Sequence, residues 1–264
     1  MRVLVTGSAD GLGLLTARTL LATGHQVVVH VRSPDRFVAV RALRNKGADV
    51  VVGDLADLDQ TRQVAEQANA LGRMDAVVHN AGVYTGPQVL PVNVVAPYVL
   101  TASMHSPDRL VYLSSGLHFS GRAGLDPIDW SGRSATATYS DSKLFVTALA
   151  GAVARLWTDV FSNAVDPGWV PTRMGGPNAP DDLRLGHLTQ EWLATSDDPA
   201  ARTTGGYWHH QHRAEPHPAA RDGRFQQELL ESLAAFTGMA LARPPLTCRL
   251  GGSSTRPAPT DHPE

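Results

Sequence analysis

Short apolar runs alternate with longer helix-like segments along most of this 264-residue chain. The runs are rich in Val and Leu and lie at residues 3–5, 27–31, 50–52, 76–78, 110–113 and 162–165. Helices are expected between and after them, at residues 12–22, 35–45, 58–71, 91–104 and 139–157. Continuous β-branched strands separated by helices are typical of a parallel sheet that is buried on both faces. The chain is therefore predicted to be α/β, with a single Rossmann-like, doubly wound parallel sheet of about seven strands and helices on both faces.

The composition of the chain changes after Pro167, where Gly, Pro and Asp become frequent. The elements expected beyond this point are an amphipathic stretch, a strand and a helix, at residues 183–193, 204–208 and 225–236. We expect one domain over residues 1–250, with a variable substrate lid at about 173–203. Residues 251–264 are rich in Pro, Ser and Thr, which favours a disordered tail.

Bulk composition excludes several classes of protein. Apolar residues make up 42% of the chain and the net charge is −2, so neither a nucleic-acid-binding surface nor a polybasic membrane patch is indicated. No apolar run reaches membrane-spanning length, and no signal peptide is expected because the first strand begins at Arg2. The single cysteine, Cys248, excludes a disulfide within the chain and fits a reducing compartment. A cytoplasmic protein that binds neither nucleic acid nor membrane is expected.

The first expected strand and helix are joined by a glycine-containing turn, Thr6-Gly7-Ser8-Ala9-Asp10-Gly11-Leu12-Gly13. Glycines let the backbone turn tightly and approach a pyrophosphate, while a helix N-terminus offers free N–H groups and the positive end of its dipole. The spacing is GxxxGxG rather than GxGxxG, and an ordinary strand-to-helix turn is the alternative. The position of the turn in the first βα unit favours a dinucleotide-binding site.

The end of the second strand indicates which dinucleotide would bind. An acidic residue there would hold the ribose hydroxyls of NAD, but the sequence reads Val29-His30-Val31-Arg32-Ser33, with no carboxylate before Asp35. Arg32 can pair with a 2′-phosphate through charge-assisted hydrogen bonds, which contribute about 1.5–3 kcal/mol each. A solvated surface arginine is the alternative. The expected cofactor is NADP(H), preferred over NAD(H).

The segment Tyr139-Ser140-Asp141-Ser142-Lys143 begins a long predicted helix. Residues four apart share a helix face, so the Tyr139 hydroxyl and the Lys143 ammonium can address one site. A nearby cation is expected to lower the pKa of the tyrosine from its usual value of about 10 towards working pH. Tyr139 would then act as the acid in ketone reduction and as the base in alcohol oxidation. Alone, this spacing is more often a surface pair, but the glycine turn upstream favours the catalytic interpretation.

Three further motifs follow the later strands: Asn80-Ala81-Gly82, Ser114-Ser115 and Pro167-Gly168-Trp169-Val170-Pro171-Thr172. With these motifs the chain resembles the short-chain dehydrogenase/reductase family from about Arg2 to Phe236. Within that family it is similar to the branch that holds retinol-dehydrogenase-like enzymes and bacterial ketoreductases of the daunorubicin type. The likeness to this branch rests on the wide gap between Ser115 and Tyr139, on Ser142-Lys143-Leu144, and on Thr204-Gly205-Gly206-Tyr207-Trp208.

The resemblance implies a role for each motif residue. The expected catalytic set is Asn93, Ser115, Tyr139 and Lys143. Ser115 would donate a hydrogen bond to the substrate oxygen, whereas the alternative role of a strand-end cap fits Ser114 better. Asp54, expected beside the adenine, could equally be a helix cap. The full set expected to bind the cofactor is Thr6, Gly7, Ser8, Asp10, Gly11, Leu12, Gly13, Arg32, Asp54, Leu55, Asn80, Ala81, Gly82, Tyr139, Lys143, Pro167, Gly168, Val170 and Thr172.

Asn93 has a physical reason to be special besides the resemblance. Pro97 lies four residues later in the same predicted helix and has no N–H, so the Asn93 carbonyl loses its helical partner. That carbonyl could hold a water linked to Lys143 and complete a proton relay. A simple helix kink with a buried amide is the alternative.

Two features depart from the family pattern. Ten residues separate Gly82 from Asn93, fewer than in most relatives, which predicts an open substrate pocket. Four histidines, His209, His210, His212 and His217, follow the last strand. No neighbouring carboxylate or cysteine pattern supports a metal there, so a solvated, Pro-rich surface segment is favoured and no metal is expected.

The leading hypothesis is an NADP(H)-dependent ketone or aldehyde reductase, and a non-catalytic NADP(H)-binding or sensing protein on the same fold is the alternative. Such proteins usually lack the tyrosine or the lysine, and a sugar-nucleotide epimerase would need a larger C-terminal domain. The substrate is expected to be an apolar, polycyclic or long-chain carbonyl compound or alcohol, because the lid carries Met174, Leu183, Leu185, Leu188, Trp192 and Leu193. A homodimer or homotetramer is compatible with the resemblance, through the helices at 91–104 and 139–157.

Overall fold

The computed structural model describes residues 1–241, so the predicted tail at 251–264 and Cys248 lie outside the described residues. Within residues 1–241, eight strands form one sheet in the order β3-β2-β1-β4-β5-β6-β7-β8. β1 to β7 run parallel, and β8 is antiparallel to β7. The α/β, doubly wound prediction is confirmed by these strands: β1 (Arg2–Val5), β2 (Gln26–Val31), β3 (Asp49–Val52), β4 (Ala76–His79), β5 (Arg109–Leu113), β6 (Phe161–Asp166), β7 (Tyr207–His209) and β8 (His212–Ala214).

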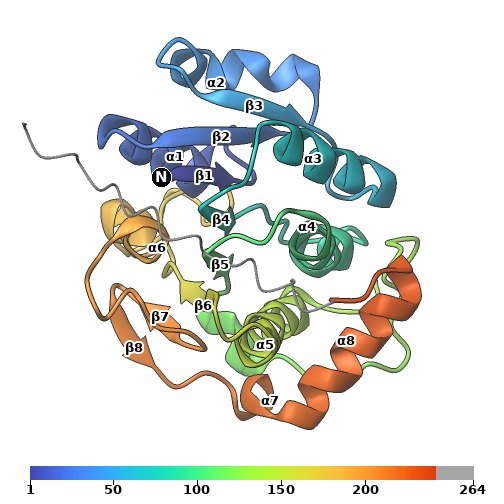
Figure 1. The fold of residues 1–264 in the computed structure, drawn as a ribbon. Helices are drawn as coiled ribbons and strands as arrows, with labels where there is room; N and C mark the ends of the chain where they lie inside the picture. The colour runs from blue at the N-terminus through green and yellow to red at the C-terminus, as the bar shows by residue number, and fades with distance from the viewer. Residues whose placement is uncertain (242–264) are drawn as a thin grey trace, which may run out of the picture.

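Helices cover both faces of the sheet. In Figure 1, α1 and α6 lie on one side of the strands, and α3, α4 and α5 lie on the other. The helices are α1 (Gly11–Ala22), α2 (Phe37–Arg44), α3 (Leu58–Ala70), α4 (Ala96–Ser103), α5 (Tyr139–Leu156), α6 (Leu183–Thr195), α7 (Pro218–Arg221) and α8 (Gly223–Thr237).

Two hydrophobic cores fill the spaces between the sheet and its helices. Alternate residues of a strand point to opposite faces, and Leu4 and Val28 accordingly pack with α3, α4 and α5. Val3, Val5 and their neighbours in β2 pack instead with α1, α2 and α6. Because both faces are apolar, the central strands carry no exposed polar side, which explains their continuous runs of Val and Leu.

The strand order reverses direction at β1, which pairs with β2 on one side and with β4 on the other. In open parallel sheets, ligands bind beyond the carboxyl ends of the strands at such a switch point. The glycine turn after β1, Arg32 after β2 and Asn80 after β4 all follow strands that meet there. The fold therefore brings the expected cofactor residues to one edge of the sheet.

The last predicted strand was placed too early. Residues 204–206 form a turn in which Gly205 has a φ of +70° and Thr204 Oγ1 accepts a hydrogen bond from the Ser162 N–H, and β7 begins only at Tyr207. A two-residue connection, His210-Gln211, then leads into β8, with φ values of 47° and 64°. Such hairpin turns usually carry Asn-Gly or Asp-Gly, so β8 could not be predicted from the residues of its turn.

The predicted helix at 91–104 is divided. Residues Pro91–Val95 form a π-helical turn, and regular α4 begins at Ala96. The irregularity surrounds Asn93, whose helical hydrogen bond was expected to be lost because Pro97 has no N–H.

Candidate active site

The glycine turn is tied to the end of β4 by a threonine. Thr6 Oγ1 accepts hydrogen bonds from the N–H groups of Asn80 and Ala81, at 2.9 and 3.0 Å. The Asn80 side chain returns a bond from Nδ2 to the Thr6 carbonyl at 2.8 Å. A Cβ at Gly7, which has a φ of +66°, would lie 2.9 Å from Ala81 Cα. Only glycine lets these two backbones approach so closely, because any side chain would force them apart.

Helix α1 begins at Gly11 and directs its N-terminus towards the pocket. Asp10 is its N-cap residue, but in the described part of the chain its carboxylate does not cap the first-turn N–H groups. It pairs instead with Arg36, whose Nη2 lies 3.3 Å from Asp10 Oδ2. The N–H groups of the first turn and the positive end of the helix dipole are left available to an anion.

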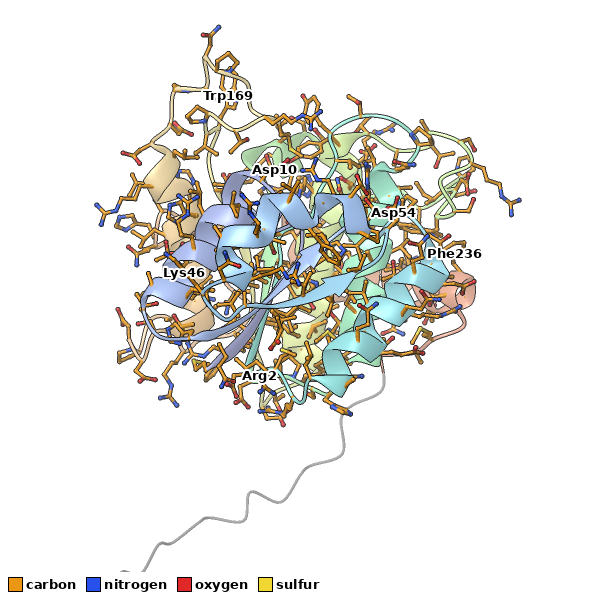
Figure 2. The ribbon with its side chains drawn as sticks, turned by 90° about the horizontal axis from the view of Figure 1, so that it is seen from above. Arg2, Asp10, Lys46, Asp54, Trp169 and Phe236 are labelled. Atoms are coloured by element: carbon orange, nitrogen blue, oxygen red, sulfur yellow. The ribbon has the colours of Figure 1, made fainter. Side chains whose placement is uncertain are left out.

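A cavity of about 640 Å³ runs along the carboxyl edge of the sheet and joins most of the expected residues. Figure 2 shows Asp10, Asp54 and Trp169 towards this edge, away from Arg2 at the start of β1. The predicted residues that line the cavity are Gly7, Asp10, Gly11, Leu12, Arg32, Asp54, Leu55, Asn80, Ala81, Gly82, Tyr139, Lys143, Pro167 and Thr172. The other expected residues support these or lie nearby, and they are Thr6, Ser8, Gly13, Asn93, Ser115, Gly168 and Val170.

Sequence reasoning missed several residues of the cavity wall. Arg36 lies four residues after Arg32 and also faces the cavity, a spacing that could have indicated a second cation for a phosphate. His30 had no such signal, because a histidine in an apolar strand is usually a packed core residue. The others come largely from the loops after β4 and β6, and they include Val83, Tyr84, Thr85, Gln88, Arg173 and Met174.

Tyr139 is the first residue of α5, and a capping box fixes its position. Thr138 Oγ1 accepts a hydrogen bond from the Asp141 N–H at 3.1 Å, and Asp141 Oδ2 accepts one from the Thr138 N–H at 2.9 Å. Lys143 follows one turn later, with its Nζ 5.3 Å from the centre of the Tyr139 ring. Lys143 is only 4% exposed and donates a hydrogen bond to the Leu113 carbonyl at 2.7 Å.

Burial shifts the pKa values of this pair. It lowers the pKa of Lys143 to about 8, against the opposing effect of the Asp166 carboxylate. It raises the pKa of Tyr139 to about 12, where a hydrogen bond with Ser115 acts in the opposite direction and Asp166 and Tyr84 add to the rise. The expected lowering of the tyrosine pKa is therefore wrong for this structure. Desolvation is the largest cause of the rise, and Tyr139 is held as a phenol, the form that donates a proton.

Of the two serines after β5, Ser115 makes the cap that was expected of Ser114. Ser115 Oγ accepts a hydrogen bond from the Leu117 N–H at 3.2 Å and so caps the 3₁₀ turn at Gly116–Ser120. Ser114 is buried, and its Oγ lies 2.6 Å from Thr147 Oγ1. Assigning the cap to Ser114 was wrong, because its hydroxyl points into the helix packing. Ser115 still lies close enough to Tyr139 to lower the pKa of its phenol.

The Asn93 side chain holds the short connection that follows Gly82 in place through hydrogen bonds. Its Oδ1 accepts a hydrogen bond from the Val83 N–H at 2.9 Å, and its Nδ2 donates to the Val83 carbonyl at 3.0 Å and to Ser142 Oγ at 2.9 Å. A Cβ at Gly82 would lie 3.4 Å from Asn93 Oδ1 and 3.7 Å from Lys143 Nζ. Asn93, Gly82 and Lys143 thus lie side by side.

Asp166 is a carboxylate near Tyr139 and Lys143 that was not predicted from the sequence. It ends β6, its side chain is 13% exposed, and its Oδ1 accepts a hydrogen bond from the Gly168 N–H at 3.0 Å. Its Oδ2 lies 3.5 Å from His209 Nδ1. The position directly before Pro167-Gly168 is the signal that could have found it, because that motif was already expected to face the cofactor.

Exposed apolar side chains lie on the loops that follow the central strands. Tyr84, Phe119 and Trp169 are 52%, 54% and 60% exposed, and they come from the loops after β4, β5 and β6. Of the exposed apolar residues, Tyr84 and Met174 line the cavity. The ring of Tyr84 lies 4.8 Å from that of Tyr139, between centroids. The short connection after Gly82 thus carries an aromatic ring to Tyr139.

The expected lid has a firmly packed part and a looser part. α6 packs against α1, and Arg109 Nη1 donates hydrogen bonds to the carbonyls of Leu193 and Ser196 at 3.2 and 2.7 Å. Before α6, residues 171–182 form turns and bends, and the Trp169 indole N–H donates to the Gly175 carbonyl at 2.8 Å. Mobility of the lid stays a prediction, and these contacts favour residues 173–182 as its moving part.

Comparison with known proteins identifies the family of this chain. A family model for short chain dehydrogenases matches residues 1–106. Short-chain dehydrogenase chry4 of Gibberella zeae is 34% identical over 257 residues, covering 92% of this chain and 99% of that protein. DnrU of Streptomyces sp. strain C5, named as a candidate daunorubicin C-13 ketoreductase, is 30% identical and covers 89% of this chain and 92% of its own length. The crystal structure of a blue fluorescent protein from a metagenomic library, in complex with NADPH, superposes with a TM-score of 0.65 at 26% identity, over 79% of this chain and 95% of that chain.

The chain belongs to the short-chain dehydrogenase/reductase family and is an oxidoreductase of that family. The expected similarity to ketoreductases of the daunorubicin type is confirmed by DnrU.

Among residues 1–241, none of the helices combines the length and hydropathy that crossing a membrane requires. Over the same residues, no group of three or more His, Cys, Asp or Glu side chains is placed to hold a metal ion. The expectation that the late histidines follow the last strand is wrong for His209, which ends β7 and pairs with His212 of β8, the strand that the sequence did not reveal.

Proposed function

We propose that this enzyme is an NADP(H)-dependent oxidoreductase that interconverts a carbonyl and an alcohol, mainly in the direction of ketone or aldehyde reduction. One observation carries the proposal. The cavity that begins at the glycine turn ends at Tyr139 and Lys143, and Ser115 lies close enough to Tyr139 to lower the pKa of its phenol. A dinucleotide that fills the cavity would therefore place its reactive end beside an acid, a cation and a hydroxyl donor.

The residues present fit NADP(H). The cavity volume of about 640 Å³ lies within the range of small-molecule and cofactor sites. Its glycine turn and the start of α1 suit a pyrophosphate, and Asp54 and Leu55 would flank the adenine. Arg32 and Arg36 supply two cations for a 2′-phosphate after β2. When bound, the nicotinamide would supply the hydride that reduces the carbonyl carbon.

The chain's own residues would handle the oxygen and its proton. Ser115 and the Tyr139 phenol donate hydrogen bonds to the carbonyl oxygen, where negative charge builds during reduction. Tyr139 then gives its proton to that oxygen, and its raised pKa keeps it protonated until that moment. The buried Lys143 ammonium stabilises the resulting phenolate, and Asn93 holds the neighbouring backbone in place.

The exposed apolar side chains of the cavity wall favour an apolar substrate. Tyr84 and Met174 line the cavity and are exposed, and exposed apolar surface of this kind marks binding sites. Aromatic rings prefer offset or edge-on contact with other rings, so a flat or polycyclic carbonyl compound would pack against Tyr84 beside Tyr139.

A cofactor-oxidation assay tests the proposal. The enzyme is offered NADPH with a panel of aliphatic, aromatic and polycyclic ketones and aldehydes, and loss of absorbance at the nicotinamide band is followed. We expect turnover with apolar members of the panel. NADPH binding without turnover of any member, in either direction, would favour the non-catalytic alternative.

A further inference from the structure

His30 connects two loops of the cofactor cavity that are far apart in sequence. The Gly7 N–H donates a hydrogen bond to His30 Nδ1 at 3.0 Å. On the other side of the ring, Nε2 lies 2.8 Å from the Gly53 carbonyl oxygen. Gly7 belongs to the glycine turn after β1, and Gly53 precedes Asp54 and the loop after β3. One side chain thus bridges both walls of the expected adenosine diphosphate site.

These contacts define the chemical state of the ring. A backbone N–H can bond to Nδ1 only if that nitrogen carries a lone pair, and a carbonyl oxygen can bond to Nε2 only if that nitrogen carries the proton. His30 is therefore neutral and protonated at Nε2. Burial, which leaves the residue 3% exposed, also lowers the pKa of the imidazole and favours the neutral form.

The histidine backbone reinforces the same connection. The Ser8 N–H donates to the His30 carbonyl at 3.0 Å, and the His30 N–H donates to Ser8 Oγ at 3.3 Å. Ser8 Oγ in turn donates to the Val5 carbonyl. The turn is held on its other side by Ala81, which a Cβ at Gly7 would touch. The conformation of Gly7 is therefore fixed between His30 and Ala81.

We propose that His30 is a positioning residue for the dinucleotide, which sets the glycine turn and the Gly53–Asp54 loop at the spacing that one ligand must span. This inference rests on the proposed NADP(H) function and adds a residue to it. It follows that His30 matters most for ligands that contact both loops. A ligand that contacts only the adenosine end depends on it far less.

The test compares NADP⁺ with adenosine 2′-monophosphate, which keeps the adenine and the 2′-phosphate but has no pyrophosphate. Dissociation constants are measured by calorimetry for wild type, His30→Phe and His30→Gln. The Phe variant keeps the ring volume without nitrogens, whereas the Gln amide can both accept and donate. We expect His30→Phe to weaken NADP⁺ binding roughly tenfold or more, because the partly buried Gly7 N–H loses its partner. The affinity of His30→Phe for adenosine 2′-monophosphate should fall by less than about threefold. His30→Gln should recover part of the NADP⁺ affinity.

The KM and kcat for NADPH and a matched control variant distinguish a positioning role of His30 from a structural one. In His30→Phe the KM for NADPH should rise while kcat at saturating NADPH stays within about twofold, because the catalytic pair is untouched. His79, which is equally buried at 3% exposure at the end of β4, provides the control. His79→Phe should lower the melting temperature without weakening the binding of NADP⁺ more than that of adenosine 2′-monophosphate.

Four results would overturn the inference. Equal affinity of wild type and His30→Phe for NADP⁺, or equal loss for both ligands, would show that His30 does not set the spacing. If His30→Phe does not fold, nitrogen NMR of the wild type still decides, because a proton on Nδ1 would contradict the bridge. A wild type that binds no NADP⁺ would overturn the proposed function, and this inference with it, whereas tight wild-type binding with an unaffected His30→Phe overturns this inference alone.

Discussion

At the residue scale, the pKa values of Tyr139 and Lys143 depend on the carboxylate of Asp166, which is distant from both residues in the sequence. Asp166 raises the pKa of both groups, in addition to the larger effect of burial. A negative charge that favours the phenol over the phenolate suits an enzyme whose tyrosine donates a proton. We infer that Asp166 biases the site towards reduction.

Replacing Asp166 by Asn should therefore lower the pKa of Tyr139. Alcohol oxidation needs the phenolate, so its pH–rate profile should move to lower pH. Asp181→Asn serves as the control, because that carboxylate bonds to the Trp169 N–H rather than to the catalytic pair. An unchanged profile in Asp166→Asn, or an equal shift in both variants, would refute the role given to Asp166.

Arg32 carries the cofactor preference at the same scale. We expect NADP(H) to bind more tightly than NAD(H), and Arg32→Ala to reduce the preference by about one to two orders of magnitude, because a charge-assisted hydrogen bond is lost. Titration of both cofactors measures the ratio. Arg41→Ala, on α2, should leave it unchanged. Equal affinities in the wild type, or an Arg32→Ala variant with the wild-type ratio, would contradict the assignment.

At the element scale, the segment before α6 differs in packing from the helix itself. Arg109 holds the end of α6, and the Gln190 side chain bonds to Thr16 of α1. Residues 173–182 lack regular structure and include Gly176, with a φ of +81°. A segment of this kind can close over bound ligands and exclude water.

Hydrogen exchange tests where the lid moves. Without ligand, the amides of residues 173–182 should exchange fast, and cofactor with substrate should slow them, while α6 stays protected in both states. Equal protection of residues 173–182 in both states would contradict a mobile lid. Equal slowing throughout α6 would show that the whole predicted lid moves.

Most elements could be predicted because their signals are local. The strands from β1 to β6 read as short apolar runs, and a proline marked the irregular turn around Asn93. The β7–β8 hairpin could not be found, because its turn is made by His210 and Gln211 with positive φ and only tertiary contacts hold it there. Gln211, for example, bonds to Thr189 of α6. Such a turn has no sequence signature.

The site shows the same division between local and distant effects. Tyr139 and Lys143 were found because they share one helix face. Asp166 and His30 were not, since their importance comes from strands brought together by the sheet. The direction of the Tyr139 pKa shift was wrong for a related reason. Spacing identifies the neighbouring cation, but burial, which dominates, is a property of the folded chain.

At the scale of the whole molecule, buried histidines make stability depend on pH. Burial lowers the pKa of His30, His118 and His79, the last to about 3. A lowered pKa in the folded state means that the unfolded chain binds more protons below pH 6.5. The stabilisation is therefore complete above about pH 6.5 and is lost as the pH falls.

Urea unfolding at pH 7.5 and pH 5 measures this loss. His79 alone should cost about 2 kcal/mol at pH 5, because the unfolded histidine titrates near 6.5 and each pH unit below that contributes about 1.4 kcal/mol. In His79→Phe the difference between the free energies of unfolding at pH 7.5 and pH 5 should be smaller by that amount. A free energy of unfolding that is equal at both pH values would show that these histidines are not buried as neutral groups.

The central claim is that Tyr139 delivers the proton that completes carbonyl reduction. The most direct measurement is single-turnover NADPH oxidation by Tyr139→Phe beside the wild type, with cofactor binding measured on the same samples. Phenylalanine keeps the ring and removes the hydroxyl, so NADPH should still bind while the reduction step slows by about 10²–10⁴-fold. Lys143→Ala should impair both turnover and binding, because Lys143 is expected to serve the proton and the ribose. A Tyr139→Phe enzyme that binds NADPH and reduces its carbonyl substrate at close to the wild-type rate would contradict the mechanism.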